Sequence, residues 1–303
     1  MPFAAYYSEE MSKTLALRLF LIVLCKSSIE SNAEEITCGL SNAQDTRAKD
    51  IPKFVIGGRN VKPGEVPGYA SLVIKSCVFG IFCQEAFCGA SIWNKTKIIT
   101  AAHCVSSDVP WITKTTVTVC IGAHENSNRA NTTDGIKCYL SERILIHPEY
   151  NTNTITNDIA IIEIPDGMDV PKFTNNGYGS TNTFCAPKDI SYVGAKCFVA
   201  GFGVWDRETK QLAPILQISE MVVIPNEECK MSYSDVTDNQ VCARGLEGQT
   251  ACNGDSGGPL FCVNEGQKFE LIGDVSYGTR DCPQGYPVVY TRNSKYLDFI
   301  RLS

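Results

Sequence analysis

Three short segments of this chain carry the side chains of a nucleophilic hydrolase. Ser256 lies in the turn-forming segment Gly254–Pro259, whose glycines let the backbone bend tightly. Far upstream, His103 follows a pair of alanines, and Asp158 precedes an apolar run. In such hydrolases a histidine takes the proton of the serine hydroxyl, and an aspartate orients the histidine. Each residue alone has an ordinary interpretation as a turn, surface or capping residue, but the three segments together predict a catalytic triad.

The order of these residues along the chain distinguishes two folds. The pattern Gly-x-Ser-x-Gly also fits the nucleophile elbow of α/β-hydrolases, in which the catalytic histidine follows the serine. All three histidines of this chain precede Ser256 (His103, His124 and His147). The order histidine, aspartate, serine is the one that chymotrypsin uses. From about Val55 to the C-terminus, the chain therefore resembles the trypsin/chymotrypsin family of serine endopeptidases.

The resemblance implies a role for each residue of the triad. Ser256 is expected to attack the scissile carbonyl, His103 to act as the general base, and Asp158 to fix and stabilise the imidazolium. The backbone amides of Gly254 and Ser256 are expected to form the oxyanion hole. Activity should fall in acid as His103 becomes protonated.

Asp255 is expected to act in the activation of a proenzyme. In the family this carboxylate pairs with the α-ammonium group that a cut releases, and the matching new terminus here is Val55. The usual basic residue before the cut is replaced by Phe54, with Lys53 one position earlier. Because a cut after Lys53 would leave one residue too many, we expect cleavage after Phe54 or a two-step trimming.

The body of the chain reads as short β runs separated by turns rich in Gly, Pro and Asn. The clearest runs are 71–74, 97–101, 115–121, 159–164, 196–200, 271–275 and 288–291. Only Ser294–Leu302 has helical spacing. With the resemblance, this pattern predicts an all-β protein: two packed six-stranded antiparallel β-barrels (the chymotrypsin fold) with a C-terminal helix.

The expected domain boundaries follow from the same comparison. The peptidase domain should occupy residues 55–303, with barrel one at about 55–173 and barrel two at about 184–303. The polar stretch Thr174–Thr183 is the expected linker. The family places its catalytic residues in the cleft between the barrels, so the fold has to bring residues from both barrels together there.

The residues that match the family's specificity pocket predict cleavage after apolar residues. The floor position is Thr250, followed by Ala251, so the aspartate that would select Lys or Arg is absent. Ser276 and Gly278 match the walls, and Val288 stands where trypsin and chymotrypsin have glycine. The branched valine should shorten the pocket, which favours small or medium apolar residues. Because Gly278 leaves the mouth open, cleavage after aromatic residues is the alternative.

The N-terminus and the cysteines indicate export. Leu15–Cys25 is apolar apart from Arg18, and Ser31–Ala33 has the small-x-small pattern of a signal-peptide cleavage site. We assign 1–33 to an N-terminal extension and signal peptide, with the signal itself at 11–33. Fifteen cysteines favour an oxidising compartment. No stretch reaches the roughly 18 apolar residues that span a membrane, and a net charge of −6 argues against nucleic-acid binding.

Fourteen cysteines follow the signal, an even number that suits complete pairing. The family pattern implies four pairs: Cys88 with Cys104, Cys197 with Cys262, Cys229 with Cys242, and Cys252 with Cys282. Similarity to chymotrypsinogen implies that Cys38 pairs with Cys185, which would tether the propeptide at residues 34–54 after activation. Proximity along the chain suggests the last two pairs, Cys77 with Cys83 and Cys120 with Cys138.

Two further expectations concern modification and metals. Asn94 and Asn131 begin glycosylation acceptor sequences that export would make usable. Ala123 replaces an acidic ligand of the family's calcium loop, so we expect no metal and no cofactor.

The sequence thus predicts a secreted, monomeric zymogen of a serine endopeptidase that cleaves proteins or peptides through an acyl-enzyme. Its expected partners are these substrates, an activating protease and protein inhibitors. The alternative from another class is a non-catalytic binding protein on the same fold. Such proteins usually lose a member of the triad, whereas this chain keeps all three.

Overall fold

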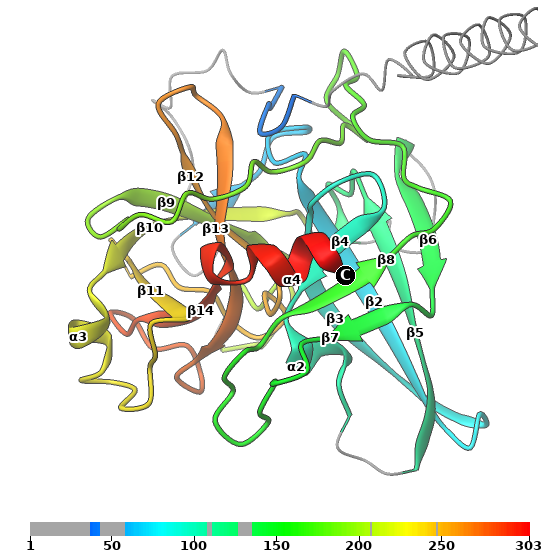
Figure 1. Ribbon diagram of the computed structural model, residues 1–303. Coiled ribbons are helices and arrows are strands. Elements are labelled where there is room, and N and C mark those ends of the chain that lie inside the picture. The colour runs from blue at the N-terminus through cyan, green and yellow to red at the C-terminus, as the bar shows by residue number, and fades with distance from the viewer. Residues whose placement is uncertain (1–36, 43–57, 108–110, 127–134, 207, 247) are drawn as a thin grey trace, which may run out of the picture. The chain divides into compact units, whose positions relative to one another are not determined.

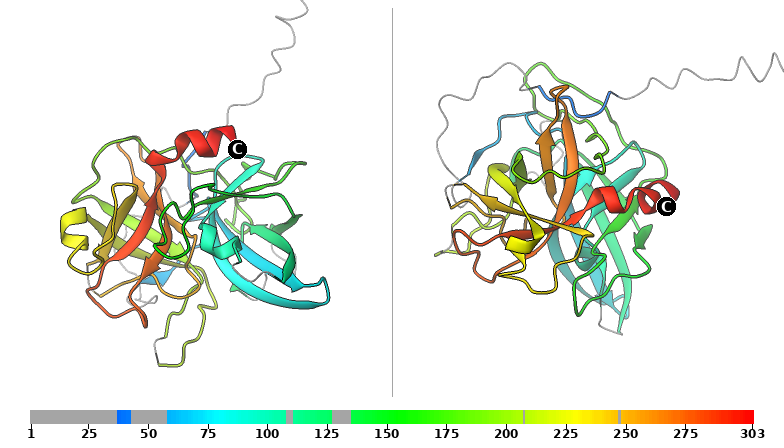
Figure 2. Two further views of the ribbon diagram at one scale, coloured as in Figure 1. Left: turned by 60° about the horizontal axis from the view of Figure 1, so that its bottom comes forward. Right: turned by 60° about the vertical axis from the view of Figure 1, so that its left-hand side comes forward.

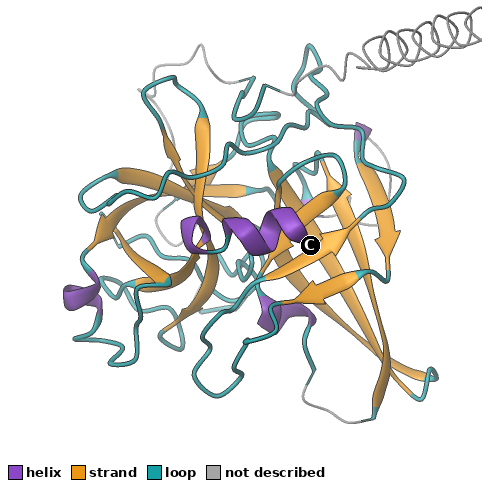
Figure 3. Cartoon of the chain, in the orientation of Figure 1, coloured by secondary structure: helices purple, strands orange, loops and turns teal. Residues whose placement is uncertain are grey.

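The structure is a computed structural model that describes residues 37–42, 58–107, 111–126, 135–206, 208–246 and 248–303. The chain divides into two units, Met1–Thr37 and Cys38–Ser303. The expected signal peptide and most of the expected propeptide lie outside the described residues. The second unit consists mainly of strands, with a few short helices (Figure 3). None of the described helices has the length and apolar character that a membrane crossing requires.

The first half of the second unit is a curled antiparallel sheet of seven strands in the order β6-β5-β2-β3-β4-β8-β7 (Figure 1). Its strands are β2 (Tyr69–Val78), β3 (Phe82–Ile92), β4 (Lys97–Thr100), β5 (Ile112–Ile121), β6 (Lys137–Ser141), β7 (Ile144–Ile146) and β8 (Ala160–Glu163). The long hairpin of β2 and β3 extends beyond the shorter strands of this sheet, and β5 pairs with β2 out to Val78 (Figure 2). Among the described residues no pairing joins β6 to β7, so the sheet is a curled half-barrel rather than a closed barrel of six strands.

The second half is a closed barrel. Its strands are β9 (Lys196–Gly201), β10 (Gln217–Ile224), β11 (Gln240–Gly245), β12 (Pro259–Val263), β13 (Phe269–Gly278) and β14 (Val288–Arg292). The order β10-β11-β14-β13-β12-β9 closes through pairing of β9 with β10. A short strand from the start of the expected first barrel, β1 (Arg59–Asn60), pairs instead with β10. The first residues of the expected first barrel therefore belong to the second sheet.

The described part of the chain also contains the short helical segments α2 (Ala102–Val105), α3 (Asn226–Cys229), the 3-10 turn η3 (Asn293–Lys295) and α4 (Leu297–Leu302). The last two form the expected C-terminal helix. Its buried residues Tyr296 and Ile300 pack in a core cluster that includes residues of both sheets. Lys97 of β4 donates to the carbonyl oxygens of Ile300 and Arg301 at 3.0 and 3.1 Å, which holds the end of α4 on the first sheet.

Three main hydrophobic clusters fill the unit, one inside each sheet and one between them. The cluster between the sheets contains the fully buried side chains of Ile99 and Ile161 from the first and Phe202 and Phe261 from the second. Burial of each such side chain contributes roughly 1.5–3 kcal/mol to folding. This cluster fixes the two sheets against each other and so determines where side chains from both can meet.

Candidate active site

His103 and Asp158 are positioned by two paired strands. Strands β4 and β8 are antiparallel neighbours in which Thr100 pairs with Ala160. His103 follows the end of β4 on α2, and Asp158 precedes the start of β8, so both lie at the same end of the pair. His103 Nδ1 lies 2.8 Å from Asp158 Oδ2, and the His103 backbone amide donates to Oδ1 at 2.9 Å. Because the carboxylate occupies Nδ1, it fixes the ring so that Nε2 is left for a nucleophile.

Asp158 is held from the second barrel as well. Its side chain is only 1% exposed, while that of His103 is 29% exposed. Ser276 of β13 donates to Asp158 Oδ2 at 2.6 Å, and Thr291 of β14 donates to the Asp158 carbonyl at 2.6 Å. A buried carboxylate is stable when hydrogen bonds satisfy it. Each oxygen of this carboxylate accepts at least one hydrogen bond, so groups from both halves of the unit fix its orientation.

Ser256 lies in the loop before β12, against the same end of the first sheet. Its carbonyl accepts a hydrogen bond from Gly89 of β3 at 2.8 Å. The neighbouring Cys88 is bonded to Cys104, the residue after His103. The structure thus brings the serine and histidine segments together. Within the described residues, Ser256 Oγ makes no hydrogen bond to His103, and such catalytic hydrogen bonds often form only with substrate bound.

The loop around Ser256 leaves two backbone amides available. The amides of Asp255, Gly257 and Gly258 donate to carbonyl oxygens within the fold. Among the described residues, the amides of Gly254 and Ser256 have no such acceptor. Gly254 has φ +97°, a conformation that favours glycine. Two unpaired amides flanking one residue are the donor set that a developing oxyanion requires.

Asp255, directly before the nucleophile segment's serine, is buried in the fold. Its Oδ1 accepts from the Gly203 amide at 2.8 Å, and its Oδ2 accepts from the Cys252 amide at 2.9 Å. Burial raises the pKa of this carboxyl to about 6. No cationic side chain of the described residues pairs with it. Its expected partner, Val55, lies outside the described residues.

A cavity of about 220 Å³ opens beside Ser256. The Val288 side chain is buried, and its Cγ2 would lie 3.8 Å from a Cβ placed on Gly278. The valine therefore faces the side of the cavity at which Gly278 has no side chain. The fold brings together every residue expected to form the pocket: Thr250, Ala251, Ser276, Gly278 and Val288.

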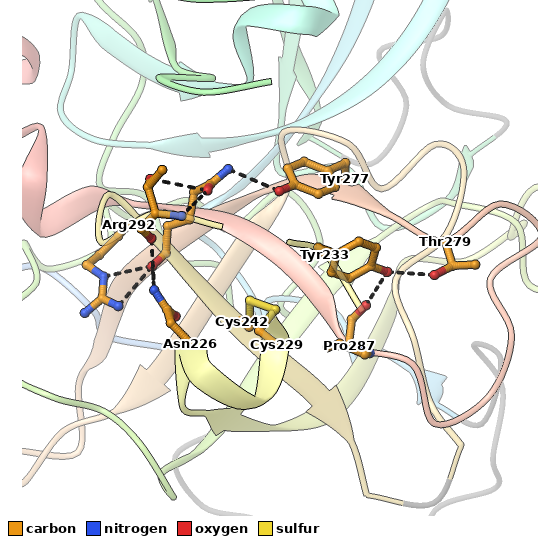
Figure 4. Close-up of a disulfide and its surroundings, with 10 residues drawn as sticks. Asn226, Cys229, Tyr233, Cys242, Tyr277, Thr279, Pro287 and Arg292 are labelled. Atoms are coloured by element: carbon orange, nitrogen blue, oxygen red, sulfur yellow. Dashed lines mark hydrogen bonds between the residues drawn. A yellow bond between two sulfur atoms is a disulfide. The ribbon is translucent and has the colours of Figure 1, made fainter. Parts of the chain in front are cut away.

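Tyr233, which holds two residues of the cavity lining, was not predicted from the sequence (Figure 4). Tyr233 Oη lies 2.8 Å from Thr279 Oγ1 and donates to the Pro287 carbonyl at 2.9 Å, and both partners line the cavity. The Tyr233 ring also makes an edge contact with Tyr277 at 5.6 Å between centroids. No local signal marks Tyr233, because these partners are 44 to 54 residues away along the chain.

The structure joins the fourteen cysteines after residue 25 into the seven expected pairs: Cys38–Cys185, Cys77–Cys83, Cys88–Cys104, Cys120–Cys138, Cys197–Cys262, Cys229–Cys242 and Cys252–Cys282. Asn94 lies in a turn in which its Oδ1 accepts the amides of Thr96 and Lys97. Asn131 lies outside the described residues. Ala123 is buried.

Comparisons with known proteins agree with this geometry. The family model described as trypsin matches residues 55–300. Fibrinolytic enzyme, isozyme C, of Lumbricus rubellus is 33% identical over 81% of this chain and 98% of its own length. Cationic trypsin-3 of Rattus norvegicus is 32% identical over 71% of this chain and 78% of its own length. A solved structure of HL collagenase superposes with a TM-score of 0.66 at 28% identity, covering 82% of this chain and 97% of that one.

Proposed function

This chain belongs to the trypsin family of serine endopeptidases, and from that premise we propose that Ser256, His103 and Asp158 are its catalytic triad. As a member of the family it is a serine-type endopeptidase that acts on protein substrates. Its many disulfides are consistent with an extracellular protein, and we propose that it is secreted as a zymogen. The observation that carries the catalytic proposal is the His103–Asp158 contact beside the Ser256 loop.

The proposed reaction follows from the positions of these groups. Ser256 Oγ attacks the scissile carbonyl while His103 Nε2 takes its proton, and Asp158 stabilises the imidazolium. The amides of Gly254 and Ser256 donate to the oxyanion of the tetrahedral intermediate. His103 then returns the proton to the leaving amine, which departs and leaves an acyl-enzyme. Water, activated by the same base, releases the acid product and restores the serine.

Covalent labelling tests this proposal against the alternative of a non-catalytic binding protein. The activated protein should react stoichiometrically with an organophosphonate, and Ser256→Ala should abolish the labelling. Ser219→Ala is a matched control, because Ser219 is a buried serine of β10 whose hydroxyl has no hydrogen-bond partner in the structure. Labelling that persists in Ser256→Ala, or an activated wild-type protein that never reacts, would contradict the proposed function.

We also propose that the enzyme prefers small or medium apolar residues before the scissile bond. Among the described residues, the lining of the cavity beside Ser256 contains no Asp or Glu, and it contains Arg280. A substrate Lys or Arg would therefore enter the cavity without a counter-charge, which is unfavourable. Val288 narrows the wall opposite Gly278, and this supports apolar residues smaller than an aromatic ring. Cleavage after aromatic residues remains the second candidate, supported by the open side at Gly278.

The proposed activation depends on the buried carboxyl of Asp255. An activating protease, in one step or two, would expose the α-ammonium of Val55, which would pair with Asp255 and order the oxyanion loop. The disulfide between Cys38 and Cys185 supports a propeptide that remains attached after this cut. Glycosylation of Asn94 is proposed on the same basis of export, because its Nδ2 donates none of the hydrogen bonds that hold its turn.

A further inference from the structure

A further buried carboxyl, that of Asp274, lies between the two sheets and takes no part in the proposed reaction. Asp274 of β13 is fully buried. Its Oδ1 accepts from Ser91 Oγ of β3 at 2.8 Å, and its Oδ2 accepts from Asn293 Nδ2 of η3 at 2.7 Å. The cluster of Ser91, Asp274 and Asn293 therefore joins the half-barrel to the closed barrel through side chains alone.

This cluster lies directly behind Asp158. Ser276, two residues after Asp274 on β13, donates to the Asp158 carboxylate. Thr291, which pairs with Asp274 across β13 and β14, donates to the Asp158 carbonyl. Asp274 is thus flanked on its own strand and on the next strand by the two side chains that hold Asp158 from the second barrel.

We propose that Asp274 is a positioning residue for the triad, a second carboxyl whose negative charge reaches His103 through Asp158 and favours the imidazolium form. The inference rests on the proposed function, since it needs His103 to be the catalytic base. It implies that the pH response of the enzyme belongs to His103, Asp158 and Asp274 together, and not to the histidine alone.

The surroundings of Asp274 raise the pKa of its carboxyl toward neutral pH. Burial, in the first place, and the nearby charge of Asp158 raise the pKa of Asp274, while the hydrogen bonds from Asn293 and Ser91 lower it, and the balance is about 7. Histidine side chains titrate in the same pH range. When Asp274 is ionised, its negative charge adds to that of Asp158, and imidazolium is favoured over the neutral base.

The elements packed around Asp274 bring no competing charge to its carboxyl. Strands β12 and β14 place Pro259 and Thr291 opposite it, while β3 and η3 supply Ser91 and Asn293. Arg292 of β14 donates instead to the Gln240 carbonyl. The hydroxyl of Tyr296, at the end of η3, donates to Asn157. Among the described residues, Asp158 is the one charged group that acts on Asp274.

The pH profile of the activated enzyme tests this inference with a matched pair of variants. Asp274→Asn keeps the shape of the side chain and removes its charge, so the midpoint of the acid limb of kcat/KM should move to lower pH by about 0.5 to 1. Glu270→Gln is the control, because Glu270 is a buried carboxyl on the same strand that bonds Tyr192 and Lys188 instead. Its midpoint should stay at the wild-type value.

Two further measurements keep the inference testable if Asp274→Asn fails to fold. Ser91→Ala removes a donor from the Asp274 carboxylate and should move the midpoint in the same direction by a smaller amount. Infrared difference spectra of the activated wild-type protein, in which Asp255 should be paired with the Val55 ammonium, should show a protonated carboxyl that loses its proton between about pH 6 and 8 and that Asp274→Asn removes. A carboxyl that stays ionised or stays protonated across this range contradicts the inference.

The possible failures can be told apart. If the activated wild-type protein does not react with an organophosphonate, the proposed function fails. If it reacts, and Asp274→Asn lowers the melting temperature but leaves the acid midpoint unchanged, Asp274 is a structural residue only and this inference alone is overturned.

Discussion

Val288 is the side chain on which the proposed selectivity depends most. Val288 and Gly278 both line the cavity, and we propose that the valine narrows it. Val288→Gly should deepen the cavity and shift the preferred residue before the scissile bond from small apolar side chains toward Phe and Tyr. One methylene group in an apolar pocket changes selectivity by about 10- to 200-fold. Cleavage of a peptide library by the activated enzyme measures the shift.

Val117→Gly is the matched control for this substitution. Val117 lies on β5, and its fully buried side chain packs in the core of the first sheet, which lines no part of the cavity. It should lower stability and leave the cleavage profile unchanged. A Val288→Gly enzyme with the wild-type preference would show that another part of the cleft sets the selectivity.

A local sequence pattern marks some residues of the candidate site and not others. His103, Asp158 and Ser256 each lie in a short recognisable segment, and their order along the chain identified the family from sequence. Tyr233 and Asp274 have no such segment. Asp274 bonds Ser91, which is 183 residues away, and only the folded chain brings such partners together. The side chains that support the cavity and hold Asp158 were therefore beyond prediction, whereas the proposed triad could be named from the sequence.

The tight turn that carries Ser256 requires glycine at position 257. Gly257 has φ +72°, and a Cβ there would lie 2.1 Å from Thr100 Oγ1 and 2.6 Å from the Gly89 carbonyl. Gly80, at the tip of the β2–β3 hairpin, also has φ +72° but would meet nothing within 4 Å. Both Gly→Ala variants should lose about 1–2 kcal/mol from the left-handed backbone. Gly257→Ala should lose more, because its methyl group collides with β3 and β4.

Melting temperature and kcat/KM separate the two effects in these variants. Gly80→Ala should melt slightly earlier and keep its activity. Gly257→Ala should melt much earlier and lose activity about 100-fold, because a displacement of roughly 1 Å in a catalytic group has that effect. Equal behaviour of the two variants would contradict the close packing of this turn against the first sheet.

Several strands could be read from the sequence, but their closure into sheets could not. Most of the predicted β runs lie within β2, β4, β5, β8, β9, β13 and β14. The predicted runs did not include β1, β3, β6, β7, β10, β11 or β12. In β3, β10 and β11 a charged residue interrupts the β-branched pattern. The expected first barrel is a curled half-barrel in the structure. Closure depends on whether its two edge strands pair, and no local sequence pattern reports that pairing.

For the molecule as a whole, the buried carboxyl of Asp255 predicts how activation changes stability. In the uncut form the pKa of the Asp255 carboxyl is raised from 3.8 to about 6. The carboxyl therefore contributes its full stabilisation of the uncut fold below pH 3.8, and this contribution is lost as the pH rises through 6. The proposed pairing with the Val55 ammonium would remove that loss. The cut form should therefore be more stable than the uncut form at pH 8, by about 3 kcal/mol for this shift. At pH 4 this difference should vanish.

Thermal unfolding of both forms between pH 4 and 8 measures this difference, with Ser256→Ala as the background to prevent self-digestion. Asp274 also has a raised pKa, but it is present in both forms and cancels in the comparison. The added substitution Asp255→Asn should abolish the pH dependence of the difference. A stability difference that stays constant with pH would contradict the proposed ion pair.

Asp158 belongs to the first sheet, yet Ser276 and Thr291 of the second hold it in place. Neither half of the molecule thus contains a working centre, and in the proposed enzyme catalytic power disappears as soon as the halves separate. A damaged copy that begins to open can be digested by intact copies but cannot attack them. A population of this protease would in this way remove its own failing members.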